Sequence, residues 1–216
     1  TPIHELKDYC IDRWLPNVAK LRNIHSADFL MVDNSPGEEY VEKIKKYCKK
    51  YNIKDYQIKH LEIAQDGSVN KSVDEQIHER VARSHEIIRQ FVLSSDYDIW
   101  FSWECDQIIP EDALDKLIEI MKMGNFMMVN HNCWDKNVPR GLCFDWGVTL
   151  VSRDYLKKYG FLLEFGTEPE PDTWYNAQIW YRKRLIRDRS PFIDLTNVIL
   201  PILHIFWKLL HYMNFP

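Results

Sequence analysis

Residues 99–110, with the sequence IWFSWECDQIIP, decide how the rest of the chain is interpreted. The segment begins as a short run of aromatic and β-branched residues, which is typical of a buried strand. It then carries two carboxylates, Glu104 and Asp106, before Pro110 and an acidic helix start. Carboxylates at the carboxyl end of a strand lie where open α/β sheets bind their ligands. Hard oxygen ligands of this kind suit Mg²⁺ or Mn²⁺ shared with a diphosphate. The alternative interpretation is a pair of solvated acids on a loop.

The composition is that of an ordinary globular protein. The 216-residue chain is long enough for one sizeable core. Its formal net charge of −4 argues against a nucleic-acid-binding protein, which would carry a basic face. The five cysteines show no CxxC spacing, so we expect reduced thiols in a cytoplasmic protein. We find no signal peptide, and the longest apolar run, 198–207, is too short to span a bilayer.

Apolar periodicity and turn residues divide the chain into strands and helices. The predicted strands cover residues 28–32, 56–63, the run from 99, 126–129 and 148–151, with a strand-like tail at 192–205. The predicted helices cover 6–21 (interrupted by Pro16), 38–51, 72–94, 111–123, 152–160 and 174–186. A β-α-β order predicts parallel pairing of the two strands. With no repeat and no linker, we expect one α/β domain.

The order of these features resembles the GT-A-fold, nucleotide-sugar-dependent glycosyltransferases of the family-two type. A strand ending in Val32-Asp33 precedes an arginine-bearing helix, the strand with the acid-X-acid pair, an acidic helix entrance and a late histidine. The resemblance spans roughly residues 28–204. It implies one Rossmann-like domain with a mostly parallel central sheet and helices on both faces. Residues 1–110 would form the nucleotide-binding half, and residues 111–216 the acceptor-side half.

More narrowly, the chain resembles a glycosyltransferase domain of large algal viruses that is associated with decorating the capsid protein. That resemblance implies a viral protein at work in the host cytoplasm.

The resemblance assigns five residues to the nucleotide. Asp33 matches the acid that receives the base and ribose, although an acid there is also an ordinary turn former. Arg83 matches the helix arginine near the nucleotide, and Arg80 is the weaker choice; a guanidinium there could instead pair with a strand-end carboxylate. Glu104 departs from the aspartate usual in the family and could hold the ribose. Cys105 is expected to make a packing or backbone contact, and nothing marks it as a nucleophile.

The same resemblance implies a metal site. Asp106 is the expected ligand, and Glu104 would bind the ion directly or through a water molecule. His204 matches a late histidine that completes the metal shell in many enzymes of this fold, although a lone histidine can equally be structural. The cofactor would be Mn²⁺ or Mg²⁺.

The catalytic base is expected among three acids that precede the helix 174–186. Asp172 is the first choice and Glu170 the second, with Glu168 the third acid of the group. Capping of the helix is the structural alternative for Asp172. The residues expected to face the acceptor are Trp134, Asp145 and Trp146, where an aromatic face could stack on a sugar or simply pack in the core.

The resemblance therefore implies a metal-dependent, inverting glycosyltransferase. It would move a sugar from a UDP-type donor to a hydroxyl group of a glycan or glycoprotein acceptor. A sugar-phosphate nucleotidyltransferase is the nearest alternative enzyme, although no Gly-rich basic loop appears near the start of the chain. The alternative from another class is a non-catalytic carbohydrate-binding domain of the same fold.

Overall fold

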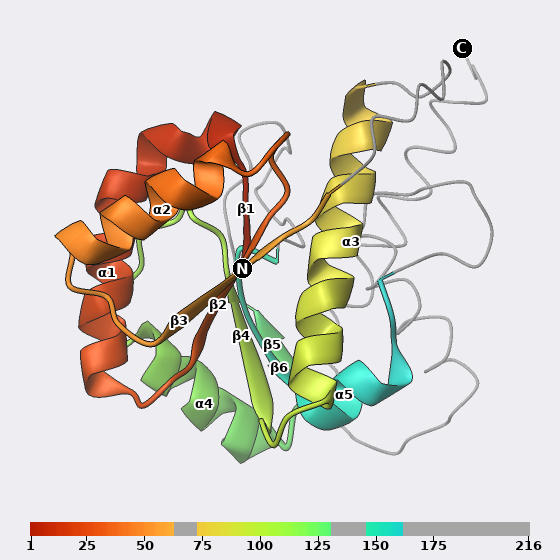
Figure 1. The fold of residues 1–216 in the computed structure, drawn as a ribbon. Coiled ribbons are helices and arrows are strands. Elements are labelled where there is room, and N and C mark those ends of the chain that lie inside the picture. The colour runs from red at the N-terminus through yellow and green to blue at the C-terminus, as the bar shows by residue number, and fades with distance from the viewer. Residues whose placement is uncertain (63–72, 131–145, 162–216) are drawn as a thin grey trace, which may run out of the picture.

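Six strands in two hydrogen-bonded sheets form the centre of the structure, a computed structural model that describes residues 1–62, 73–130 and 146–161 (Figure 1). The first sheet has the order β1-β2-β3, with β1 (Pro2–Ile3), β2 (Phe29–Asp33) and β3 (Tyr56–His60) all parallel. The second has the order β4-β6-β5, with β4 (Ile99–Trp103), β6 (Val148–Ser152) and β5 (Met128–Asn130). Both β4 and β5 are antiparallel to β6, so β6 alone reverses direction within its sheet.

Five α-helices surround these strands in the described part of the chain. They are α1 (Asp8–Ile24), α2 (Glu39–Lys50), α3 (Val73–Leu93), α4 (Ala113–Gly124) and α5 (Arg153–Lys158), and a 3₁₀ turn, Glu5–Lys7, precedes α1. The predicted β-α-β unit is confirmed, since β2 and β3 pair in parallel on either side of α2. The helix expected at 174–186 and the strand-like tail at 192–205 lie outside the described residues.

Helices cover both faces of the sheets, as predicted. One core cluster joins α1, α2 and α4 to strand residues that include Met31 and Leu150. The other joins α3 and α5 to strand residues that include Val32 and Val151. Neighbouring residues of one strand point to opposite faces, which explains why each strand supplies both clusters. Because each cluster contains side chains from both sheets, the two sheets act as one layer between the helices. The division into a nucleotide half and an acceptor half stays a prediction.

Pro16 does not interrupt the first helix, contrary to expectation. A proline inside a helix removes the N–H that would bond the carbonyl group four residues earlier, here that of Asp12. The hydroxyl group of Tyr51 lies 2.7 Å from the Asp12 carboxylate and 3.2 Å from that carbonyl oxygen, so its one proton is shared between them. A partner from the segment after α2 therefore partly replaces the lost hydrogen bond, and α1 continues to Ile24.

The C-terminal end of α3 is held by Arg153. Its guanidinium group donates to the carbonyl oxygens of Val92 (3.1 Å), Leu93 (2.8 Å) and Tyr97 (3.2 Å), and also to that of Ser95. These carbonyls have no partner within the helix, and a cation there also suits the helix dipole. The contact joins α3 to the start of α5 and so positions the face of α3 that packs on β2.

Candidate functional site

The two acids after β4 lie on a tight turn. The Gln107 N–H donates to the Glu104 carbonyl oxygen at 3.2 Å, and the Glu104 N–H donates to the Gly147 carbonyl oxygen at 2.7 Å. Farther along, the side chain of Asn17 makes two hydrogen bonds to the Ile109 backbone, at 3.0 and 2.9 Å. The turn is thus tied to the strand beside it and to α1, which brings the side chains of Glu104 and Asp106 toward one point.

A lysine lies at that point. The Lys7 ammonium nitrogen is 3.1 Å from Glu104 Oε2 and 3.0 Å from Asp106 Oδ2. Burial disfavours the charged lysine, but the two carboxylates outweigh this effect and raise its pKa above the ordinary value. Because Lys7 follows β1 and the acids follow β4, this bridge joins the carboxyl ends of the two sheets.

The acid pair fits a divalent cation. The shared ammonium group is a stand-in cation, since one carboxylate oxygen from each acid approaches it at about hydrogen-bonding distance. Hard carboxylate oxygens suit Mg²⁺ or Mn²⁺, which proteins often bind through one or two carboxylates together with substrate phosphates. Within the described ranges, no group of three or more His, Cys, Asp or Glu side chains could hold a metal. The expected ligand His204 lies outside those ranges.

A second polar cluster forms at the ends of β2 and β3. The Asp33 carboxylate is fully buried, and its Oδ1 accepts from the Ser35 hydroxyl group at 2.6 Å and the Ser35 N–H at 3.1 Å. Its Oδ2 lies 2.8 Å from Nδ1 of His60. Both carboxylate oxygens are therefore engaged, so Asp33 positions Ser35 and His60 rather than presenting a free acid.

Those two residues line a hollow of about 140 Å³, together with Pro36, Gly37, Glu38 and Glu62. Gly37 has φ +74°, a left-handed conformation that glycine adopts without steric cost, and it turns the chain back toward α2. Glu38 and Glu62 are exposed acceptors and His60 is a polar ring. Hydrogen-bond acceptors of this kind suit ribose hydroxyl groups and the N–H of a base.

The 3₁₀ turn connects this hollow with the acid pair. The Glu5 N–H donates to the Ser35 hydroxyl oxygen at 2.9 Å, two residues before Lys7 contacts Glu104. The 3₁₀ turn thus contacts the lining of the hollow through Glu5 and the acid pair through Lys7.

The α3 arginines differ in their surroundings. The Arg83 side chain is 51% exposed and pairs with Glu79 on its own helix. Arg80 is half-buried, and burial, followed by the positive charge of Arg80, lowers the pKa of His4. Between the two arginines and β2, the Asn34 amide donates to the Ser84 hydroxyl oxygen at 2.9 Å. Arg80, the weaker choice from sequence, is thus the less exposed of the two arginines, and the choice between them stays a prediction.

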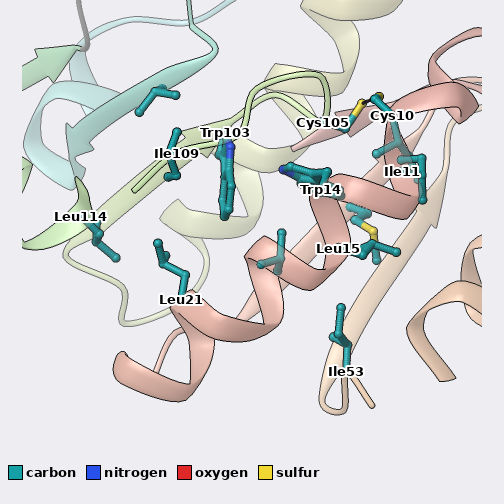
Figure 2. Close-up of a cluster of buried hydrophobic side chains, with 14 of the residues drawn as sticks. Cys10, Ile11, Trp14, Leu15, Leu21, Ile53, Trp103, Cys105, Ile109 and Leu114 are labelled. Atoms are coloured by element: carbon teal, nitrogen blue, oxygen red, sulfur yellow. Dashed lines mark hydrogen bonds between the residues drawn. The ribbon is translucent and has the colours of Figure 1, made fainter. Parts of the chain in front are cut away.

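Cys105 is a core residue. It is 1% exposed, and its sulfur lies 3.8 Å from that of Cys10 (Figure 2). Burial raises the pKa of the Cys105 thiol, so the side chain is neutral and its expected packing role is the one observed. Figure 2 shows the two cysteines beside Trp14 in the cluster beneath α1.

Trp146 does not face an acceptor, which corrects the expectation from sequence. Its side chain is fully buried and packs against His85, Trp100 and Phe161, with ring centroids 5.1–5.6 Å apart. An indole ring enclosed in this way offers no face for stacking on a sugar. The other expected site residues, Trp134, Asp145, Glu168, Glu170, Asp172 and His204, lie outside the described residues.

The described chain is similar in structure to a known glycosyltransferase, residues 1–349 of TarS from S. aureus. The TM-score is 0.56 at 11% sequence identity, and the match covers 83% of this chain and 53% of that chain. The present chain therefore spans about half the length of the TarS structure. The likeness shows that the chain has a GT-A-type glycosyltransferase fold. No protein-family model matches it, and no curated protein sequence matches it either.

Against this GT-A frame, the acid pair and the Asp33 cluster both lie at strand ends, where α/β folds bind ligands. Sequence reasoning missed three residues there: Lys7, Ser35 and His60. His60 is the last residue of β3 but lies inside the longer strand predicted at 56–63, so the sequence did not mark it as a strand-end residue. In the part of the chain that the structure describes, no helix has the length and apolar character needed to cross a membrane.

Proposed function

We propose that this chain is a glycosyltransferase that moves a sugar from a UDP-type nucleoside diphosphate donor to a hydroxyl group of a glycan or glycoprotein acceptor. The observation that carries the proposal is the convergence of Glu104 and Asp106 on one cationic group, next to the hollow at Ser35 and His60. The GT-A fold supports the reaction class.

The nucleoside would occupy the hollow. His60 and Ser35 would bind it, each held by the buried Asp33 carboxylate, and Glu38 or Glu62 would accept hydrogen bonds from ribose hydroxyl groups. Arg80 would add positive charge on the side toward His4. The diphosphate would then extend past the 3₁₀ turn toward the acid pair.

Asp106 and Glu104 would hold a divalent cation, Mn²⁺ or Mg²⁺. Such an ion, when bound, neutralises the charge that develops on a diphosphate leaving group. His204 is the third ligand that the family resemblance implies. Two carboxylates repel a diphosphate and a single ammonium group offsets only one of them, so a divalent cation at this place would favour donor binding.

The transfer itself needs a base. A carboxylate would take the proton from the acceptor hydroxyl group while that oxygen attacks the anomeric carbon from the face opposite the diphosphate, which inverts the configuration. The family resemblance assigns this role to Asp172 first and Glu170 second, with Trp134 and Asp145 beside the acceptor. A viral capsid glycoprotein as acceptor, and the host cytoplasm as location, remain implications of the narrower resemblance.

The proposal is tested by incubating the protein with UDP, GDP and their sugars in the presence and absence of Mn²⁺. A nucleotide at about 100 times its dissociation constant should raise the free energy of unfolding by about 2.7 kcal/mol, which a thermal shift detects. A transferase should also release UDP slowly from its donor by transfer to water. Binding without any release would identify a carbohydrate-binding or nucleotide-binding module, and pyrophosphate-dependent release of a sugar phosphate would identify a nucleotidyltransferase.

Asp33→Asn is expected to weaken UDP binding about tenfold while leaving pyrophosphate binding unchanged. Asparagine keeps an oxygen for Ser35 but presents an N–H group to His60, so the orientation of the histidine changes. Losing one charge-assisted hydrogen bond costs about 1.5–3 kcal/mol. A loss of about 1.4 kcal/mol in binding free energy raises the dissociation constant tenfold, so the lower end of this range gives the expected effect. Calorimetry with the two ligands measures the difference. Equal losses for UDP and pyrophosphate, or a lower melting temperature with unchanged UDP affinity, would show that Asp33 only stabilises the fold.

A further inference from the structure

Lys7 occupies the place between Glu104 and Asp106 that a divalent cation would take. We propose that Lys7 and the divalent cation compete for this pair of carboxylates, and that the displaced ammonium group then binds the diphosphate of the nucleotide. The second half of this inference rests on the proposed function, whereas the first half concerns the cation alone.

The charges favour such an exchange. Among the described side chains at this place, Lys7 and the two carboxylates together carry one net negative charge, which repels a diphosphate. A divalent cation on the carboxylates, with the ammonium group still nearby, changes this to one net positive charge. A site that holds both cations therefore attracts the donor, while a site that holds Lys7 alone does not.

The backbone of Lys7 is fixed by hydrogen bonds, whereas its side chain is partly exposed. The Lys7 N–H donates to the His4 carbonyl oxygen at 2.9 Å, and the Cys10 thiol donates to the Lys7 carbonyl oxygen at 2.7 Å. The side chain is 39% exposed and carries its charge on a flexible four-carbon stem. The ammonium group can thus leave the carboxylates by rotation of the side chain, without any change in the fold.

The released ammonium group stays close to the path between the two binding places. Lys7 ends the 3₁₀ turn whose Glu5 N–H bonds Ser35 beside the hollow. The Lys7 ammonium group contacts both carboxylates, so a cation that binds them must displace it. A lysine ammonium group is a common phosphate ligand.

The first measurement is Mn²⁺ binding without nucleotide, followed by the electron paramagnetic resonance signal of the free ion. Lys7→Met keeps most of the length of the side chain and removes the competing charge, so we expect it to bind Mn²⁺ about tenfold more tightly than the unsubstituted protein. Lys43→Met is the matched control. Lys43 also pairs with a carboxylate, that of Asp8 at 2.7 Å, and its loss changes the net charge equally.

The second measurement is UDP binding at saturating Mn²⁺, by calorimetry. Here the expected effect has the opposite sign: Lys7→Met should bind UDP about tenfold more weakly, whereas Lys43→Met should match the unsubstituted protein. Tighter metal binding combined with weaker nucleotide binding is the signature of the exchange. A lysine that only stabilised the turn would lower the melting temperature and give neither effect.

Three results would overturn the inference. If Lys7→Met and Lys43→Met bind Mn²⁺ alike, or if neither binds it, Lys7 does not compete with the cation. If UDP binds the unsubstituted protein equally well without Mn²⁺ and this binding is lost in Lys7→Met, the lysine replaces the metal instead of exchanging with it. If the unsubstituted protein binds no nucleotide, the proposed function and the diphosphate role of Lys7 fail together, and the Mn²⁺ comparison alone decides the competition.

Discussion

Replacing Asp106 with asparagine is expected to lower kcat for sugar transfer about a thousandfold and to abolish the dependence of UDP binding on Mn²⁺. Asparagine has nearly the same shape but no charge, so the proposed cation site would lose one of its two described carboxylates. Stabilisation of the departing diphosphate by a cation is worth several kcal/mol, and each 1.36 kcal/mol corresponds to tenfold in rate. Initial rates and UDP calorimetry, each with Mn²⁺ and with a chelator, measure both effects.

The control for this substitution is Asp112→Asn. Asp112 lies in the same loop, its carboxylate pairs with Lys116 at 2.6 Å, and it is 57% exposed. The Asp112→Asn substitution removes the same charge six positions farther along the chain, so the rate of transfer should stay within about twofold of the original rate. The Asp106 side chain is itself 31% exposed, and the fold should survive its replacement. Comparable rates in the two variants would rule out a metal-binding role for Asp106.

Acidification is expected to destabilise the protein through His85. This side chain is fully buried among Trp100, Trp146 and Phe161, and neither ring nitrogen has a hydrogen-bond partner among the described residues. Burial lowers its pKa to about 3. The unfolded chain, with a histidine pKa near 6.5, therefore binds a proton that the folded chain does not, over the range between these two values.

The contribution of the uncharged His85 to the free energy of unfolding is complete above about pH 6.5. It falls by about 1.4 kcal/mol for each pH unit below that value, until the pH approaches 3. Between pH 7 and pH 5 the free energy of unfolding should thus drop by about 2 kcal/mol on account of His85. Urea denaturation at both pH values measures the drop, and His85→Leu should reduce it by that amount. Leucine also removes two buried nitrogens without partners, so its stability at pH 7 should be close to the original. An unchanged pH dependence in His85→Leu would mean that the ring reaches water.

Local patterns in the sequence were sufficient for the elements of the fold. The strand predicted at 28–32 is β2, the helix predicted at 38–51 is α2, and the strand predicted at 148–151 is β6, each within two residues of its observed bounds. Apolar side chains repeat with the period of the structure that buries them, which makes such segments readable without tertiary information. The place of the acid pair at the carboxyl end of a strand was predictable in the same way, because Glu104 and Asp106 come directly after a buried apolar run.

Contacts between distant positions were decided only by the tertiary structure. Lys7 and Glu104 are 97 positions apart, and nothing near either residue marks the other as its partner. The carbonyl group that Pro16 leaves without its helical partner likewise meets a hydroxyl group from Tyr51, 39 positions farther along the chain. A charged or polar side chain has the same local surroundings in the sequence whether it meets water or a partner.

The aromatic residues show the same division. Trp100 is read as a strand residue from its neighbours in the sequence, and it is buried as expected. Trp146 and His85 lie in segments whose local composition fits either a surface or a core. Both are buried because α3 and β4 pack around the same place, and Phe161 then covers it.

The sequence by itself determined which segments form strands and helices, since that depends on periodicity along the chain. The tertiary structure decided which side chains meet, since burial depends on elements that arrive from elsewhere in the chain.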